Sequence, residues 1–312
     1  MAKSASAYKE RVVKPNDRLF VTILYICMIL VMMITLYPMW YSVINSFNTA
    51  ADLAKNGYAY FLPREFTLDS WKSVLSDKEI VRAFMVTFTR TVIVTVLQTL
   101  ITAMFAYGFS RNNLRGRKLY STVGFISMYL SGGVIAYFIL YNTLNLYNTY
   151  WVYIIPALFG GFYNVIIFNA NFKTIPDTLF ESAKIDGASE YRIFFQIVLP
   201  LSKPVLSALA IFTAVGTWND YSATLYYTRS SDLQTLSYYL LAITKSSKAA
   251  EELQKSMSVG VAANLSNVVS QSSNYRTIEL ACMVLAALPL IIVYPFLQKF
   301  FEKGIMVGSV KG

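Results

Sequence analysis

Two ionisable side chains, Arg90 and Asp220, stand inside long apolar stretches of this 312-residue sequence. Ionisable residues within membrane segments usually face the interior of a helix bundle and mark a functional site. Because a guanidinium donates hydrogen bonds and a carboxylate accepts them, the two residues could hydrogen-bond a hydroxylated solute. They could equally form a structural ion pair, since buried charges usually have a partner. The sequence leaves both alternatives open.

Aromatic and amide side chains near these two residues suggest a second kind of binding chemistry. A sugar has apolar C–H faces and a ring of hydroxyl groups, which aromatic rings and amide or carboxylate groups contact well. Trp151 has this chemistry too, but anchoring at the membrane interface is the favoured role for it. We therefore predict a substrate path lined by Arg90, Tyr137, Asn142, Trp218, Asn219, Asp220 and Tyr221.

Groups suited to catalysis are scarce. The sequence has no histidine and no G-x-x-x-x-G-K-[ST] loop, so the commonest general base, the serine triad and the loop that cradles nucleotide phosphates are missing. Cys27 and Cys282 both lie in apolar runs, which indicates packing rather than a disulfide. We expect no catalytic residue, no metal site and no cofactor bound by this chain.

The composition indicates the solvent in which these residues act. The chain is 55% hydrophobic and 14% charged, with a mean hydropathy of +0.46, too apolar for an ordinary soluble domain. A helix needs about 20 mainly apolar residues to cross a bilayer. The sequence predicts an all-α integral membrane protein with about six transmembrane helices, at residues 19–41, 83–109, 119–141, 150–169, 201–227 and 278–296. Glycine pairs at 132–133 and 160–161 predict close helix packing.

The charges beside these spans predict their orientation. Basic residues precede the first span and crowd the loop near Arg115 and Lys118, whereas the loop at 142–149 carries no charge. Under the positive-inside rule, residues 1–18 form a cytoplasmic segment, 19–300 the transmembrane domain and 301–312 a cytoplasmic tail. The long loop 228–276 then lies outside the cell. The net charge of +10 reflects juxtamembrane residues rather than a nucleic-acid surface.

A charged segment at 174–200 interrupts the apolar runs on the cytoplasmic side. Thr174, Pro176 and Asp177 combine a capping-box pattern with a proline suited to a helix start. Gly187 suits a left-handed stop, and Ser189 can cap a second short helix. The pattern predicts a hairpin of two short helices at the membrane surface.

This hairpin resembles the EAA loop of ABC importer permeases. Glu181-Ser182-Ala183, three residues, Gly187, nine residues and Ile197-Val198-Leu199-Pro200 match E-A-A, G and I-x-L-P at the family spacing, with Ser182 the one departure. The segment T-W-N-D-Y at 217–221 and the tail G-S-V-K-G at 308–312 are similar to carbohydrate-uptake permeases of the maltose-transporter type. The long loop 228–276 resembles permeases fed by lipoprotein binding proteins in Gram-positive bacteria.

The resemblance implies a type I ABC importer fold in the bacterial cytoplasmic membrane. It also implies partners: a second homologous permease chain, two ATPase subunits that hold ATP and Mg²⁺, an extracellular solute-binding lipoprotein and membrane lipid. Glu181 would pair with a basic residue of the ATPase, Leu179, Phe180 and Ala183 would fill its groove, and Lys311 would insert between the ATPase subunits. The residues implied in ATPase coupling are Leu179, Phe180, Glu181, Ser182, Ala183, Asp186, Gly187, Ile197, Leu199, Pro200 and Lys311.

The leading functional hypothesis is therefore the permease subunit of an ATP-driven oligosaccharide importer, which is not itself an enzyme. One alternative keeps the ABC machinery but carries an amino acid, a polyamine or an anion. Another is a membrane scaffold or receptor that transports nothing. A membrane-embedded enzyme is disfavoured, because paired catalytic groups at suitable spacing are missing.

Overall fold

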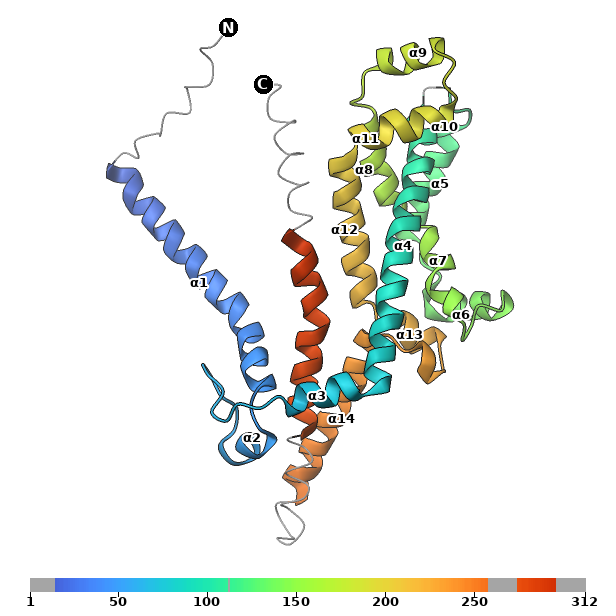
Figure 1. The fold of residues 1–312 in the computed structure, drawn as a ribbon. Helices are drawn as coiled ribbons and strands as arrows, with labels where there is room; N and C mark the ends of the chain where they lie inside the picture. The colour runs from blue at the N-terminus through green and yellow to red at the C-terminus, as the bar shows by residue number, and fades with distance from the viewer. Residues whose placement is uncertain (1–14, 112, 258–273, 296–312) are drawn as a thin grey trace.

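The computed structural model describes residues 15–111, 113–257 and 274–295. Within them the chain is almost entirely helical, and one isolated bridge between Asn48 and Phe66 is the only β-pairing in this part. The centre is a bundle in which α4 (Lys78–Ser110) packs along α12 (Lys203–Asn219) and α8 (Phe162–Phe172), as Figure 1 shows. The prediction of an all-α chain is confirmed for the described residues.

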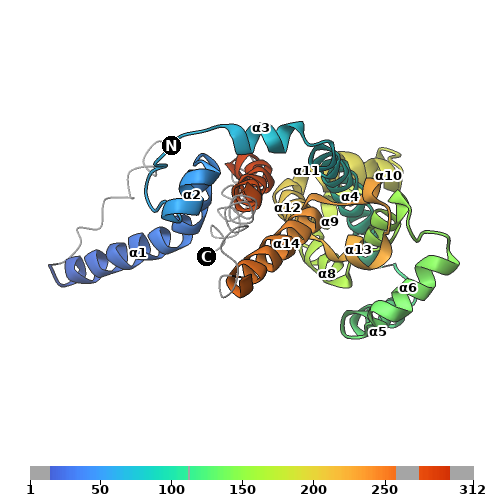
Figure 2. The same ribbon diagram turned by 90° about the horizontal axis from the view of Figure 1, so that it is seen from below.

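Three helices are long and apolar enough to cross a bilayer: Arg18–Ser46 within α1 (Pro15–Ser46), α4, and the red helix Asn274–Pro295. Three bent helix pairs pass the same criterion of length and composition, which raises the number of possible spans to six. The first helix, α1, stands apart from the bundle (Figures 1 and 2). It exposes apolar side chains along its length. Such a surface needs lipid or another chain to cover it.

The predicted span at 119–141 is a bent pair of helices rather than one helix. The structure has two helices there, α5 (Arg117–Tyr129) and α6 (Gly133–Thr143), which meet at 114°. Gly133 has φ of +72°, a left-handed conformation that only glycine adopts at little cost, so the glycine pair at 132–133 redirects the chain where α6 begins. At the pair 160–161 the predicted close packing is found at Gly160 alone, where a Cβ would lie 2.3 Å from Nε2 of Gln98, whereas a Cβ on Gly161 would meet no atom within 4 Å.

The fourth and fifth predicted spans also break. Residues 150–169 form η1 (Tyr150–Tyr153), α7 (Ile155–Leu158) and the start of α8, with a bend of 45°. The fifth span ends at Asn219 rather than Tyr227, because Oδ1 of Asp220 accepts a hydrogen bond from the Ser222 backbone N–H at 2.9 Å. That carboxylate therefore starts a separate helix, α13 (Ser222–Tyr227).

The segment expected as a long loop, 228–276, is partly helical where it is described. It contains η3 (Ser231–Leu233) and the 22-residue helix α14 (Leu236–Met257). The fully buried Leu236 joins α14 to the core near the N-terminal end of α4, and its backbone N–H donates to Oγ1 of Thr87 at 2.8 Å. This end of the bundle lies opposite the helical hairpin at 174–200 (Figure 1).

A small lobe built from α2 (Ala50–Asn56) and the chain around it lies beside the same end, next to α3 (Asp69–Ser76). Its centre is the buried carboxylate of Asp52, which accepts hydrogen bonds from Asn48, Asn56 and Arg64 at 2.7 to 2.8 Å. The hydrogen bond from Asn56, together with those from Asn48 and Arg64, holds the pKa of Asp52 below its usual value despite burial.

We expect this lobe to loosen in acid. A carboxyl group with a lowered folded-state pKa contributes stability above its unfolded pKa, near ~3.9, and loses it as the pH falls through the folded value. The protection factors of the backbone amides in residues 48–66, which are exchange rates corrected for the intrinsic effect of pH, should therefore fall below about pH 4. The variant Asp52→Asn should exchange faster already at pH 7 and should show a weaker pH dependence. An unchanged exchange rate in Asp52→Asn would contradict this account.

Candidate functional site

The helical hairpin is formed by α9 (Asp177–Ile185) and by α10 (Glu190–Ile193), which continues through the π-helical turn η2 (Phe194–Val198) into α11 (Leu199–Leu201). Gly187 at its turn has φ of +74°, as predicted. Oγ of Ser189 accepts a hydrogen bond from the Arg192 backbone N–H at 3.3 Å, which confirms the predicted cap. The capping box does not form, because the Thr174 hydroxyl donates to the carbonyl oxygen of Asn171.

The two faces of α9 differ sharply. Leu179, Glu181 and Ile185 are exposed on the side away from the bundle, and Ile185 is 86% exposed. Phe180 and Ala183 face the other way and are buried with the core beneath the hairpin. This corrects the expectation that Phe180 and Ala183 fill a partner's groove, because in this conformation the chain's own core covers them. Leu179 and Ile185 are the apolar side chains that remain available to a partner.

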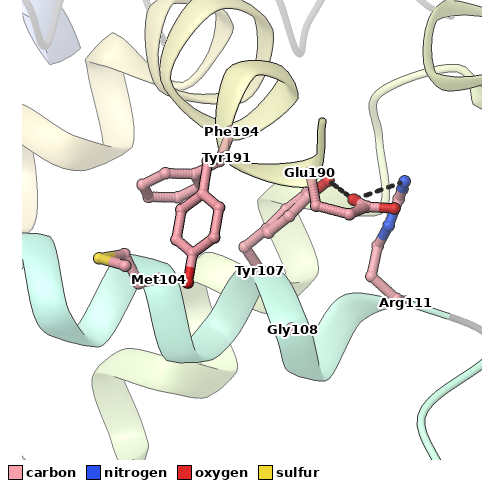
Figure 3. A pocket seen from close by; sticks show the side chains of 7 residues that line it. All are labelled: Met104, Tyr107, Gly108, Arg111, Glu190, Tyr191 and Phe194. Atoms are coloured by element: carbon pink, nitrogen blue, oxygen red, sulfur yellow. Dashed lines mark hydrogen bonds and ion pairs between the residues drawn. The ribbon is translucent and has the colours of Figure 1, made fainter. Parts of the chain in front are cut away.

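A set of polar contacts ties the hairpin to the end of α4, as Figure 3 shows. The Tyr107 hydroxyl donates to Oε2 of Glu190 at 2.5 Å, and Arg111 lies 3.6 Å from the same oxygen. Nζ of Lys184, on α9, lies 2.9 Å from Oε1 of Glu190. The hydrogen bond from Tyr107, supported by Lys184 and by the charge of Arg111, holds the pKa of the Glu190 carboxyl below its usual value. Glu190 is therefore ionised at neutral pH.

A second site lies inside the bundle, far from the hairpin. Nη2 of Arg90 forms an ion pair with Oδ2 of Asp220, and Nη1 of Arg90 donates to the Asp220 carbonyl oxygen at 3.3 Å. The guanidinium carbon also lies 4.7 Å from the centroid of the Tyr153 ring, within the range of a cation–π contact. Of the two predicted alternatives, the structure therefore contains the ion pair. The Arg90 side chain is 4% exposed, whereas that of Asp220 is 29% exposed.

This ion pair lies in the wall of a cleft of about 370 Å³. Tyrosine rings from three elements line the cleft with it, and Tyr141 and Tyr227 meet edge to face with their centroids 4.8 Å apart. Apolar ring faces beside a partly exposed carboxylate can contact the C–H faces and hydroxyl groups of a sugar. In the described part of the chain, no three acidic or thiol side chains gather in a group that could hold a metal ion.

Comparison with known proteins identifies the chain. The family described as the binding-protein-dependent transport system inner membrane component matches residues 98–307, which include the hairpin, α12 and α13. The chain belongs to this family. Such a component is the membrane part of a transport system that depends on a separate binding protein, and the bundle with its possible spans fits that place.

Several relatives of this inner membrane component are similar over nearly its whole length. Protein LplC of Bacillus subtilis is 38% identical over 279 residues, which cover 89% of this chain and 90% of LplC. The polygalacturonan/rhamnogalacturonan transport system permease protein YtcP, also of Bacillus subtilis, is 34% identical over 298 residues, which cover 95% of this chain and all of YtcP. The chain is therefore similar to both relatives over most of its length.

A solved structure shares the fold. A chain of a bacterial ABC transporter involved in the import of the acidic polysaccharide alginate superposes with a TM-score of 0.79 at 24% identity. The superposition covers 92% of this chain and 98% of the other. The inner membrane component therefore has the permease fold of that importer, which confirms the expected type I ABC importer fold.

The cleft of this inner membrane component contains only part of the predicted substrate path. Arg90 and Asp220 line it. Trp218 does not, because its ring is buried in the core and its Nε1 donates to the Ala286 carbonyl oxygen at 3.0 Å. Asn219 is exposed elsewhere and donates to the Val215 carbonyl oxygen at 3.0 Å, and Tyr221 is exposed outside the cleft.

Tyr137 and Asn142 lie near the cleft rather than in it. Tyr137 stacks on Tyr141 with the ring centroids 5.9 Å apart, and Asn142 is exposed on α6. Three tyrosines that line the cleft were not among the predicted residues: Tyr141, Tyr153 and Tyr227. The spacing of Tyr137 and Tyr141, four residues apart, was the one available signal, because such residues share a helix face.

The remaining hairpin residues occupy varied positions. Ile197 and Leu199 pack partly buried against the core under the hairpin, and Asp186 is exposed at the end of α9. The Ser182 hydroxyl donates to the Leu179 carbonyl oxygen at 3.2 Å, and Pro200 lies within α11. Lys311 lies outside the described residues, so its predicted contact with the ATPase stays a prediction.

The turn of the hairpin offers a direct test of its geometry. At φ of +74°, a β-branched residue costs roughly 1–2 kcal/mol, whereas asparagine tolerates the left-handed conformation better. A Cβ at Gly187 would meet no atom within 4 Å, so this cost is conformational rather than steric. We expect Gly187→Val to lower the thermal unfolding midpoint clearly and Gly187→Asn to lower it little. Equal midpoints for the two variants would contradict this explanation.

Proposed function

We propose that this chain is the permease subunit of an ATP-driven, solute-binding-protein-dependent importer whose substrate is an oligosaccharide. The family supports a membrane component fed by a binding protein. The printed names of several relatives, among them permeases for polygalacturonan/rhamnogalacturonan, arabinooligosaccharides and maltodextrin, support a sugar substrate. The observation that carries the proposal is the hairpin: it projects at one end of the bundle and presents Leu179, Glu181 and Ile185 to a partner.

In this proposal the hairpin receives the work of ATP hydrolysis from two ATPase subunits, which bind the ATP and Mg²⁺. An exposed acidic side chain between two exposed apolar ones suits a groove with a basic residue beside it. Closure of the ATPases would move the hairpin and rock the bundle as a rigid body, so that the cleft opens alternately to the two sides. A second permease chain would complete the pathway and would cover part of the apolar surface of α1.

The cleft at Arg90 and Asp220 would form this chain's share of the solute path. The ion pair keeps both charges satisfied in an apolar setting, and the exposed part of the Asp220 carboxylate can accept hydrogen bonds from hydroxyl groups. Tyr141 and Tyr227 add ring faces. The expected orientation puts both termini and the hairpin in the cytoplasm, and the cleft toward the outer half of the bacterial cytoplasmic membrane.

Two other functions make different predictions. An importer for an amino acid, a polyamine or an anion would have the same hairpin and would differ in the solute that it takes up. A scaffold that transports nothing would bind no ATPase through Glu181, and variants of the hairpin would leave its behaviour unchanged. The names of the relatives and the tyrosines in the cleft favour the sugar importer.

Reconstitution of the complete transporter tests the proposal. The chain, its partner permease, the ATPase and the solute-binding protein are placed in proteoliposomes, and the uptake of labelled oligogalacturonides and maltodextrins is measured with and without ATP. We expect ATP-dependent uptake of one class of oligosaccharide and none with a hydrolysis-deficient ATPase. Uptake of an amino acid or polyamine instead, or co-purification of the ATPase without any uptake, would contradict the proposal.

A further inference from the structure

The hairpin is joined to the bundle by more than its own chain ends. Its Glu190 carboxylate is held by groups from two other elements: Tyr107 and Arg111 at the end of α4, and Lys184 on α9. Figure 3 shows the α4 side of this arrangement beside a cleft of about 380 Å³. We refer to Tyr107, Arg111, Lys184 and Glu190 as the Glu190 latch. One carboxylate thus connects both arms of the hairpin with α4.

Arg111 strengthens this connection through its position between two aromatic rings. Its guanidinium carbon lies 4.1 Å from the centroid of Phe180 on α9 and 5.1 Å from that of Tyr107 on α4. The Arg111 side chain is 22% exposed, so these cation–π contacts are partly shielded from water. An arginine that only extended into water from the end of α4 would make none of these contacts. Arg111 instead touches α4, α9 and α10 together.

The helix to which the latch attaches is continuous. One unbroken helix, α4, includes both Tyr107 and Arg90, and the residue at the cleft lies about 26 Å from the latch at ~1.5 Å per residue. The hairpin is joined covalently to α12, where the chain bends by 83° between Leu201 and Lys203. A bend of that size can act as a hinge, so the covalent route by itself would transmit a push on the hairpin poorly.

We infer that the Glu190 latch makes the hairpin and α4 move as one body, so that a displacement of the hairpin reaches the Arg90–Asp220 cleft through α4. Its members are positioning residues, since none of them lines the Arg90–Asp220 cleft. The expected effect on transport rests on the proposed function. The rigid connection between the hairpin and α4 is a property of this chain alone. It predicts that a broken latch uncouples ATP hydrolysis from transport without detaching the ATPase.

The first test measures coupling in the reconstituted transporter. Glu190→Ala removes the shared acceptor, and Tyr107→Phe removes one donor while it keeps the ring. We expect the ATPase to co-purify as with the unchanged protein and to hydrolyse ATP, while uptake per ATP falls about 10-fold in Glu190→Ala and less in Tyr107→Phe. Because both changes break one network, the double variant should fall no further than Glu190→Ala. Asp177→Asn is the matched control, an exposed acidic residue of α9 with no ion pair among the described residues.

The second test needs no transport. Spin labels are attached at Asp177→Cys on the hairpin and Phe105→Cys on α4, both exposed sites, in a background with the exposed Cys27 replaced by serine. Electron–electron double resonance on the full chain should give one narrow distance distribution, which broadens at least about twofold with Glu190→Ala.

The two tests separate the inference from the proposed function. If the unchanged transporter takes up no sugar but the distance distribution broadens, the proposed function is wrong and the latch stands. In the other case the unchanged transporter takes up sugar normally, so the proposed function stands. The latch is then overturned by either of two results: Glu190→Ala keeps its full uptake per ATP, or its distance distribution stays narrow. Loss of the ATPase from the purified Glu190→Ala complex would also overturn the latch, since its role would then be assembly.

Discussion

Replacement of Glu181 by lysine is expected to lower ATP-driven uptake by roughly 100-fold or more, the largest effect of any single change in the hairpin. Glu181 is exposed on the outer face of α9 and makes no ion pair within the described residues. Its carboxylate is therefore available to a basic residue of the ATPase. Lysine would place two positive charges together in a contact that excludes water, which weakens both binding and the transfer of movement.

The control for Glu181→Lys is Asp177→Lys, at the start of the same helix. Asp177 is also exposed and lies one turn earlier on the same face, at the N-terminal end of α9 and beyond the stretch from Leu179 to Ile185. Uptake and ATPase co-purification should be close to normal in that variant, apart from a small effect of the charge on the helix N-terminus. If both lysine variants lose uptake equally, a general effect of positive charge explains the result and the specific contact of Glu181 is rejected.

The second large effect is expected at the cleft. The variant Arg90→Met replaces the aliphatic stem of the arginine with a similar unbranched apolar chain but leaves the Asp220 carboxylate without its guanidinium. Breaking a buried ion pair from one side is strongly destabilising, and because Asp220 is 29% exposed we expect a loss of about 2 kcal/mol, below the fully buried range. The thermal unfolding midpoint of the purified permease should fall, and uptake should be lost. The milder Asp220→Asn keeps the acceptor for the Ser222 N–H and should destabilise less.

A charge-swapped double variant then separates the two roles of the pair. Arg90→Asp with Asp220→Arg restores opposite charges but removes the carboxylate that accepts from the Ser222 N–H, so stability should return only in part. If uptake stays lost while stability recovers, the Asp220 carboxylate acts on the solute as well as on Arg90. Recovery of uptake together with stability would contradict the binding role and would leave the pair as a structural ion pair.

The sequence alone determined the local features of this chain. Composition and run length indicated a membrane bundle, and the spacing from Glu181 to Pro200 indicated the family before any geometry was known. The left-handed turn at Gly187 and the Ser189 cap were predictable for the same reason: each depends on the backbone preferences of a few neighbouring residues. Such short-range preferences can be read from residue type and spacing.

The tertiary structure alone decided which surfaces meet. Periodicity made α9 amphipathic, but only packing assigned Phe180 to the chain's own core and Ile185 to the outside. Arg90 and Asp220 are 130 residues apart, so their pairing depends on how α4 packs on α12. Trp218 is a residue type that often contacts sugars, but in the fold its side chain is buried in the core. Long-range contacts of this kind come from the packing of whole elements, which no window of neighbouring residues contains.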